Sequence, residues 1–590
     1  MRKTRLVTLI ITSLVTVVLF FSIIRNIWPA FEHYSNSKIP RLVKFGQKSR
    51  MDSSKNHVVI IGGGLAGMSA AIEAYLKSPS TKVTLFDKEP KLGGNSAKAS
   101  SGINGVHTIT QKQFGVQDSV DLFSQDTIRS GRGLSDPGLV NKLVVDSTES
   151  VSWLQDFFKL DLDVLARLGG HSARRTHRRP DLPDGRPQPV GFGITKTLSS
   201  WIEKEASTSN GRLSLNLDAK VVKLLTDTNG DVNGIEILKK NVEGEIKENV
   251  FARAVVLATG GFAGEGANAA LLKQYAEQYY GLPTTNGPWA TGDGVLLGQD
   301  VGAGIVDMDQ VQVHPTAFVS SKDPYAQTKF LAAEALRGEG GVLLNFNGKR
   351  FVNELDTRDN VTSAIWEKSN SSDLIKNIYG EDPQTESKPT SQSPNSSAFL
   401  ILSKEAADKF GMGALNFYMK MGLIHKAESL GDLSEKIQVP KSTLLQEFIK
   451  YEAAKAGIIK DEFGKSTFPA SILSPKDSNL DDLFKSVDWS DPSTLLTTLK
   501  SSETSVGSKD VFYWGIITPA LHYTMGGLLF NNKAQVLRSD KTPINGLFAA
   551  GEVTGGLHGK NRLGGNSLLE CVVFGREAGK RASDYTKSMI

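Results

Sequence analysis

The chain has 590 residues, of which 39% are apolar and 22% are charged, so it can bury a large core and is not wholly disordered. Its net charge of +5 is too small for its size to indicate nucleic acid as a partner. The one cysteine, Cys571, excludes an internal disulfide, a cysteine-ligated zinc or iron–sulfur site and a c-type haem attachment, and we expect no metal site.

The N-terminus carries a hydrophobic segment. Three basic residues among the first five precede an uncharged stretch over residues 6–24, which Arg25 ends. This length suits a membrane span or a long signal peptide, and no small-residue cleavage site follows it. We therefore expect a signal anchor or signal peptide over 1–30 and a basic linker near anionic lipid over 31–56. The segment predicts a protein tethered by its N-terminus in the endoplasmic reticulum or a mitochondrion, with a cytosolic form as the alternative.

A dinucleotide-binding unit is predicted directly after the linker. Residues 57–61 (HVVII) and 82–86 (KVTLF) fit buried parallel strands, and a helix is expected over 68–77. The turn before the helix, residues 62–67, reads GGGLAG, and Asp87 stands twenty residues past its last glycine. Strand, glycine motif, helix and acid together place a pyrophosphate at the helix N-terminus and predict that Asp87 accepts hydrogen bonds from ribose hydroxyls.

Two more strand-and-turn units lie far along the chain, over residues 254–262 and 547–553. Separate pieces of this kind indicate one cofactor domain that an insertion interrupts. We predict an α/β fold in which a Rossmann-like FAD-binding domain is interrupted by an α+β capping domain. The predicted parts are a first FAD-binding part over 57–310, a capping or substrate domain over 311–519 and a C-terminal FAD-binding part over 520–590.

The insertion has two further features. Apolar residues recur at spacings of three and four over 404–460, which predicts helices. Residues 380–397 are rich in Pro, Ser and Gln, which predicts a surface loop.

Seven motifs carry a family likeness. Small residues over 93–96 (GGNS) and 100–104 (SSGIN) offer backbone donors along an elongated cofactor. The sequence resembles the flavoprotein family of fumarate reductases and succinate dehydrogenases, above all its monomeric fungal members and the flavin domain of bacterial flavocytochromes. The other motifs are 313–316 (VHPT), 333–338 (AEALRG), 353–359 (NELDTRD), 522–527 (HYTMGG) and 559–567 (GKNRLGGNS).

The resemblance implies that the protein reduces fumarate to succinate, with hydride passing from N5 of reduced FAD. It assigns His314, His522 and Arg562 to the binding of the substrate carboxylates. It makes Arg358 the proton donor, and Glu334 and Arg337 the path that resupplies the proton of Arg358.

The residue types suit this chemistry on their own terms. A dicarboxylate needs cations and donors, and arginine offers a planar two-pronged donor that a neutral substrate would not require. Glu334 and Arg337 stand three residues apart and share a face if helical, so they can pass a proton.

The predicted cofactor is non-covalent FAD. Asn95 stands where the family's membrane-bound members carry the flavin-linking histidine, and Tyr523 where the flavocytochromes carry histidine. Its hydroxyl would reach the pyrimidine edge of the flavin. The predicted contacts are Gly62, Gly64, Ala66, Gly67, Asp87, Lys88, Asn95, Ser96, Ser101, Gly102, Ile103, Asp293, Tyr523, Glu552, Ser567 and Leu568.

The fungal resemblance implies that the electron donor is free reduced flavin, FMNH2 or FADH2, and that the protein is a monomer.

Other interpretations of the function stay open at this point. A succinate dehydrogenase-type flavoprotein, or a flavin enzyme acting on another acid such as an aspartate oxidase or an aryl-acrylate reductase, are the alternative enzymes. A membrane-tethered flavin-binding module without catalysis is the alternative outside enzymes.

Overall fold

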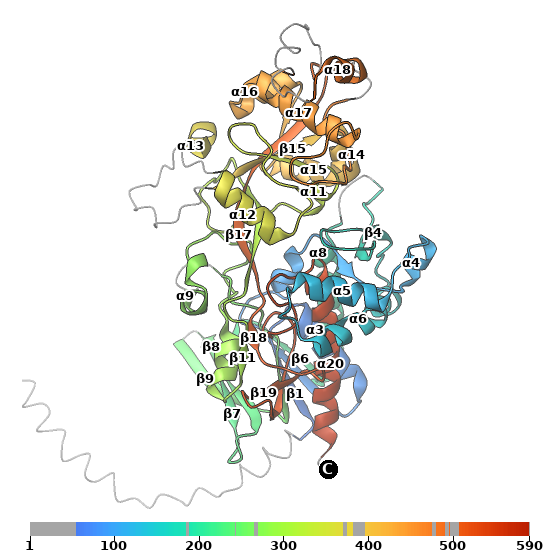
Figure 1. Cartoon of the computed structure of the whole chain (residues 1–590). Coiled ribbons are helices and arrows are strands. Elements are labelled where there is room, and N and C mark those ends of the chain that lie inside the picture. The colour runs from blue at the N-terminus through green and yellow to red at the C-terminus, as the bar shows by residue number, and fades with distance from the viewer. Residues whose placement is uncertain are drawn as a thin grey trace, which may run out of the picture. The chain divides into compact units, whose positions relative to one another are not determined.

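In the computed structural model, the glycine-rich turn follows an inner strand of a six-stranded sheet (Figure 1). β1 (His57–Ile61) is buried along its whole length and pairs in parallel with two neighbours. A strand covered on both faces needs apolar residues on both, which explains why residues 58–61 are all apolar. The other strands are β2 (Lys82–Phe86), β6 (Leu213–Asn216), β10 (Ala254–Leu257), β20 (Pro543–Ala549) and the antiparallel edge strand β19 (Gln535–Leu537).

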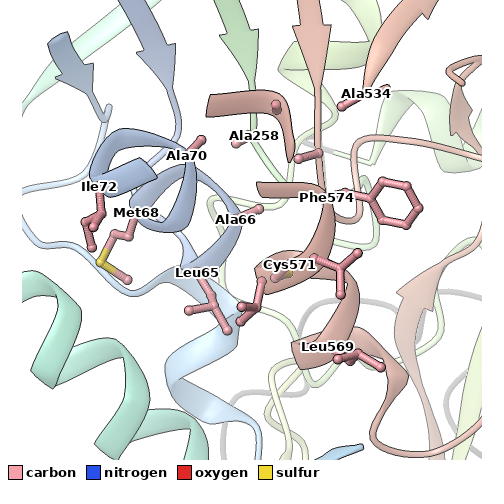
Figure 2. Close-up of a cluster of buried hydrophobic side chains, with 14 of the residues drawn as sticks. Leu65, Ala66, Met68, Ala70, Ile72, Ala258, Ala534, Leu569, Cys571 and Phe574 are labelled. Carbon is pink, nitrogen blue, oxygen red and sulfur yellow. The ribbon is translucent and has the colours of Figure 1, made fainter. Parts of the chain in front are cut away.

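Two helices from opposite ends of the chain pack together against this sheet. α3 (Leu65–Lys77) follows the glycine-rich turn, and α20 (Asn566–Lys587) is the last helix of the chain. Figure 2 shows apolar side chains of both helices in one cluster, with Ala66 of α3 and Cys571 of α20 on the sides that face each other. A Cβ added at Gly579 would lie 2.2 Å from the carbonyl oxygen of Ala70, so the two backbones approach too closely for a side chain there. This packing brings the first turn of α20 beside the glycine-rich turn.

The other face of the sheet is covered by a second core cluster. A three-stranded antiparallel sheet and two short helices contribute to it. These elements are β7 (Ala219–Thr226), β8 (Val232–Asn241), β9 (Gly244–Phe251), α9 (Ala270–Tyr275) and α10 (Asp293–Asp300).

The insertion is built on a second sheet, in the strand order β13-β12-β17-β15-β14. β12 (Val311–Val319) and β17 (Phe512–Thr524) pair antiparallel along its middle, and both are almost wholly buried. β17 crosses the predicted boundary between residues 519 and 520 as one continuous strand. The two predicted domains therefore share it, and His522 lies near its end.

β11 (Ile305–Val306) and β18 (Gly527–Leu528) form a two-stranded antiparallel sheet, and η4 (Glu277–Tyr279) follows α9. The other elements fall into two groups. Between β2 and β6 lie η1 (Gly94–Lys98), β3 (Ile103–Asn104), α4 (Ile109–Gln113), α5 (Val120–Ser130), α6 (Pro137–Val145), α7 (Ser147–Ser152), η2 (Trp153–Phe157), β4 (Val164–Ala166), β5 (Thr176–Arg178) and α8 (Val190–Thr208). The insertion holds β13 (Phe330–Leu331), α11 (Ala335–Gly338), β14 (Val342–Leu344), α12 (Arg358–Lys368), α13 (Leu374–Tyr379), β15 (Ala398–Ser403), α14 (Lys404–Phe410), α15 (Met412–Lys420), β16 (His425–Ala427), α16 (Leu430–Ile437), α17 (Lys441–Lys455) and α18 (Leu480–Ser486).

The predicted fold class is confirmed, and so are helices over 404–460, where α14 to α17 lie with β16 between them. The first predicted helix begins three residues earlier than expected, at Leu65, because the glycine turn already belongs to its first turn.

Several predicted segments lie outside the described residues: the anchor, nearly all of the linker and most of the loop over 380–397. In the described part of the chain, no helix is long and apolar enough to cross a membrane. The structure describes residues 55–183, 188–241, 244–264, 269–369, 374–380, 396–474, 480–489, 495 and 507–588.

Candidate active site

A cavity of about 1020 Å³ lies at the carboxyl ends of β1, β2, β10 and β20. Its wall includes the first turns of α3 and α20, so two helix N-termini face it. Helix N-termini carry partial positive charge and free N–H groups, which favour anionic groups of a ligand. Arg358, His522 and Arg562 line the same cavity. The predicted cofactor site and part of the predicted substrate site are thus one continuous space.

The glycines of the turn serve different purposes. Gly62 has φ +105°, and a Cβ there would lie 2.2 Å from the carbonyl oxygen of Ala258, so only glycine fits between β1 and β10. A Cβ at Gly67 would lie 1.8 Å from the carbonyl oxygen of Gly62, which shows how tightly α3 packs on the strand. A Cβ at Gly64, by contrast, would meet no described atom within 4 Å, because Gly64 faces the cavity at the start of α3. The space beside Gly64 suits a pyrophosphate.

The acidic residue after β2 supports this turn. Asp87 accepts hydrogen bonds from the backbone N–H groups of Gly63 (2.6 Å) and Glu89 (2.8 Å). Its contact with a ribose stays a prediction. The neighbouring Lys88 Nζ donates to Asp293 at 2.7 Å, so the structure joins two predicted cofactor residues from distant parts of the chain. Both line the cavity.

The segment around η1 closes one side of the cavity. Asn95 donates to the Asn286 side chain (2.6 Å) and accepts from the Gly287 backbone N–H (2.9 Å), which ties this segment to the 284–287 loop. Ser96, Ser101 and Gly102, three of the predicted FAD contacts, line the cavity. Ile103 does not line it: its side chain is fully buried in the core, so it contributes to packing.

Four other predicted FAD contacts also line the cavity: Ser567 and Leu568 in the first turn of α20, Tyr523 at the end of β17, and Glu552 after β20. The Tyr523 hydroxyl donates to Glu570 rather than standing free for the flavin, so only its ring is available to the cavity. Glu552 accepts from the Thr524 backbone N–H at 2.9 Å. Burial raises the pKa of Glu552 to about 7.

The two predicted substrate histidines lie side by side, with ring centroids 5.1 Å apart. β12 carries His314 and β17 carries His522, so the antiparallel pairing of these strands brings them together. Burial lowers the pKa of both imidazoles well below 6.5, and the charge of Arg358 lowers it further, so both are neutral at pH 7. No described residue is a hydrogen-bond partner of His314 Nε2, which is buried.

Arg358 and Glu334 form a buried ion pair. Arg358 Nε and one terminal nitrogen donate to the same Glu334 oxygen at 3.0 and 2.6 Å, and the other terminal nitrogen has no partner among the described residues. The second oxygen of Glu334 accepts from the Gly169 backbone N–H at 3.0 Å. Burial favours the neutral acid, but the charges of Arg358 and Arg337 outweigh it and lower the pKa of Glu334 to about 2. Glu334 is therefore a carboxylate.

Arg337 is held from behind. It donates to the backbone carbonyl of Glu354 at 2.6 Å, and its other nitrogens, Nε and Nη2, are buried without a partner in the described chain. The Glu354 side chain in turn binds Arg350 and Lys465, all of them buried. This network fixes Glu354, whose backbone carbonyl group holds Arg337 in place.

Arg562 differs from Arg358 because its side chain forms no ion pair with a described acidic residue. Its backbone N–H donates to the Gln312 side chain at 3.0 Å, and its guanidinium carbon lies 4.6 Å from the centroid of the Tyr523 ring. Burial and then the charge of Arg358 lower the pKa of Arg562 to about 9. A buried arginine held by an aromatic face favours an incoming anion.

Sequence reasoning missed several residues that hold this site. Thr285 Oγ1 lies 2.8 Å from His522 Nδ1, across 237 residues of chain, and no local pattern marks it. Gly169 also has no motif around it. Glu354 stands inside the 353–359 motif, and Gln312 two residues before His314, so proximity to a motif is the signal that could have found them.

The wall of the cavity fits FAD. It offers open space at Gly64 and Gly260, two helix N-termini for a pyrophosphate, and an acid at the end of β2. Trp289 Nε1 lines the same space and is buried without a described hydrogen-bond partner. These are the groups that a large nucleotide cofactor would satisfy.

Comparisons with known proteins agree with this geometry. Residues 57–568 match the FAD binding domain family. The chain is 40% identical over 544 residues to "Fumarate reductase 1" of Saccharomyces cerevisiae, covering 90% of this chain and 100% of that one. It is 38% identical over 534 residues to "Fumarate reductase" of Schizosaccharomyces pombe, covering 90% of each. Among solved structures, the open conformation of a flavocytochrome c3 fumarate reductase superposes with a TM-score of 0.64 at 29% identity, covering 93% of this chain and 83% of that one.

Proposed function

The chain belongs to the fungal-type fumarate reductase family of FAD-dependent oxidoreductases, and we propose that it reduces fumarate to succinate. The observation that carries this proposal is the buried group of two arginines and two neutral histidines at one end of the FAD cavity. Several of its nitrogens have no partner among the described residues. Two carboxylates would supply acceptors for these donors.

Carboxylate binding falls to three residues. Arg562 supplies the charge, and its Nε is free of any described partner. His314 Nδ1 lies 3.2 Å from the Thr316 backbone N–H and 3.1 Å from the Thr316 carbonyl oxygen. When Nδ1 accepts from the N–H, the neutral ring carries its proton on Nε2, which has no described partner and can donate to a carboxylate. The Thr285 hydroxyl lies 2.8 Å from His522 Nδ1 and 3.1 Å from the Leu521 carbonyl oxygen, and when it donates to Nδ1 it leaves the His522 proton on Nε2.

Proton delivery falls to Arg358. When bound, reduced FAD supplies a hydride to one alkene carbon, and the other alkene carbon then needs a proton. Arginine holds its proton strongly, with a pKa above ~12 in water, so Arg358 can serve only if it is reprotonated at once. Glu334 is ionised and bonded to two Arg358 nitrogens, so it can return a proton to Arg358. The charge of Arg337 acts on Glu334, but no hydrogen bond joins the side chains of these two residues among the described contacts.

The proposed electron donor is free reduced flavin. The sequence has no haem-attachment motif and no cysteine set for an iron–sulfur cluster, as its single cysteine shows. The cavity is also lined by Phe410, Phe417 and Tyr418 and by the cationic residues Lys329 and Arg179. Aromatic rings beside cations suit a second, transient flavin.

The decisive experiment measures oxidation of reduced FMN or FAD by a panel of unsaturated acids under nitrogen. We expect fumarate to be reduced with a kcat/KM far above those of acrylate and cinnamate, because only a dicarboxylate uses both ends of the site. A preference for a monocarboxylate would support the aryl-acrylate alternative. Faster succinate oxidation than fumarate reduction would support the dehydrogenase, and no turnover would support the binding module.

We also propose that residues 1–30 tether a monomeric enzyme to the membrane of the endoplasmic reticulum or a mitochondrion. The basic and then uncharged N-terminal sequence supports this. Residues 54–590 form a compact unit by themselves. A chain that starts at residue 51 should therefore keep its flavin and its turnover but lose membrane association. Loss of flavin would show that the N-terminal segment belongs to the enzyme fold.

A further inference from the structure

A buried polar chain lies behind the cavity wall and has no part in the mechanism above. The Tyr523 hydroxyl donates to Oε1 of Glu570, and Oε2 of the same carboxyl group lies 2.7 Å from His558 Nε2. All three side chains are almost wholly buried. The His558 ring also meets the Tyr523 ring edge to face, with centroids 5.6 Å apart.

The chain ends on the arginine that we assign to substrate. The Tyr523 ring is the aromatic face under the Arg562 guanidinium, at 4.6 Å. His558 stands four residues before Arg562 on the same loop. The loop, the first turns of α20 and the end of β17 are thus joined in a closed circuit of contacts: Arg562 on Tyr523, Tyr523 on Glu570, and Glu570 on His558.

Burial favours the neutral forms of both members of the Glu570–His558 pair. Burial raises the pKa of Glu570 well above 4.5, and burial lowers the pKa of His558 well below 6.5. The carboxylic acid therefore donates through Oε2 to His558 Nε2 and accepts from the Tyr523 hydroxyl through Oε1. A glutamine at this position can make both contacts, because its amide has one acceptor and one donor arm.

We propose that Glu570 and His558 are positioning residues that hold the Tyr523 ring as a platform for Arg562 and so set the affinity for the dicarboxylate. This inference rests on the proposed role of Arg562 in carboxylate binding. The platform matters because no described acidic side chain is ion-paired with Arg562. A ring that tilts would leave the guanidinium without the aromatic face that supports it.

The test compares four variants of the full-length holoenzyme. Tyr523→Phe keeps the ring and removes the link to Glu570, whereas Glu570→Leu removes the link from the other side. Each should raise KM for fumarate about tenfold with kcat changed less than threefold, since a desolvated cation–π contact is lost in ground state and transition state alike. Glu570→Gln should keep KM within about twofold of wild type. The double variant Tyr523→Phe with Glu570→Leu should have a KM for fumarate no higher than that of either single variant.

Two measurements separate this role from a general structural one. The flavin-to-protein ratio should be unchanged in every variant, and the absorbance change of bound flavin on adding succinate should report the same loss of affinity without turnover. In an Arg562→Met background, Glu570→Leu should raise KM no further. The proposal would be overturned if Glu570→Leu raised KM as much in Arg562→Met as in the wild type. It would also be overturned if Tyr523→Phe and Glu570→Leu both had the wild-type KM.

Failure of the proposed function would look different. If wild type neither reduces fumarate nor responds to succinate, the assignment of the substrate is wrong. If wild type does both and Arg562→Met loses affinity while the Tyr523 and Glu570 variants do not, only the platform is wrong. Should Glu570→Leu fail to fold, Tyr523→Phe still decides, because it changes a single hydroxyl.

Discussion

At the scale of single residues, the two arginines of the site are held in opposite ways. Arg358 is ion-paired with Glu334 through two nitrogens, whereas Arg562 rests on the Tyr523 ring. A paired arginine can exchange a proton with its partner, and one without a partner attracts an anion. The same type of side chain is thus suited to two different roles because its neighbours differ.

Substitution of these arginines should separate binding from chemistry. Arg562→Met should raise KM for fumarate roughly 10- to 150-fold, since charge-assisted hydrogen bonds contribute about 1.5–3 kcal/mol. Arg358→Ala should lower kcat by ~10²–10⁴-fold with a smaller effect on KM, because general acid catalysis is lost. Arg358→Lys should restore part of kcat. Steady-state kinetics check all three, and normal turnover of Arg358→Ala would show that another group is the acid.

The pH dependence should report Arg562. Its pKa is lowered to about 9 by burial and by the charge of Arg358, so it is a cation below pH 9 and loses its proton above. Fumarate needs the cation, so kcat/KM should fall as pH rises through about 9. The residual kcat/KM of Arg562→Met should not show this fall at alkaline pH. A wild-type profile that stays flat to pH 10 would contradict the prediction.

Thr285 should act through His522. Thr285→Val removes the hydroxyl that lies 2.8 Å from His522 Nδ1 and leaves the ring free to carry its proton on Nδ1. We expect kcat/KM for fumarate to fall about tenfold, the cost of roughly 1.4 kcal/mol, and Thr285→Ser to restore it. The measurement is the ratio of the two variants at equal flavin content. Equal activity of both would show that the hydroxyl does not set the tautomer.

At the scale of elements, an ion pair joins the two halves of the site. Arg132, in the turn after α5, binds Asp359 in the first turn of α12, which also carries Arg358. Both side chains are partly exposed. Because the first lies in the cofactor part and the second in the insertion, the pair favours the arrangement in which α12 stands over the cavity.

Breaking this pair should change affinity more than stability. Arg132→Ala should lower unfolding stability by less than ~1 kcal/mol, as exposed pairs do, and raise KM two- to fivefold, with kcat unchanged. Lys404→Ala is the matched control, since it breaks the exposed Lys404–Asp408 pair within α14 alone. Thermal unfolding and kinetics in low and high salt check both. A KM change of the same size in the control would rule out a role for the Arg132 pair.

At the scale of the whole molecule, one cofactor cavity is assembled from residues between 61 and 571. Asn95 stands at the position where the family resemblance places the flavin-linking histidine of the membrane-bound members. Its side chain forms hydrogen bonds with Asn286 and Gly287. Nothing at this position can attach the flavin covalently.

Acid precipitation should therefore release the yellow chromophore completely into the supernatant. Absorbance of the supernatant and of the redissolved pellet measures the two fractions. The non-covalent assignment fails if flavin stays with the washed pellet.

The sequence by itself determined the features that depend on residues close together along the chain. The bounds of β1 and β2, the glycine turn and its acid, and the active-site motifs were all predicted, because strand burial and tight turns leave local patterns. Thr285, the Glu570–His558 pair and the Arg132–Asp359 pair were not. Their partners lie on other elements: the Thr285 backbone N–H donates to the Leu521 carbonyl beside His522, His558 lies on the loop before α20, and Arg132 after α5 meets Asp359 in α12. A side chain's partners are decided by the register and packing of distant segments, which no local pattern records.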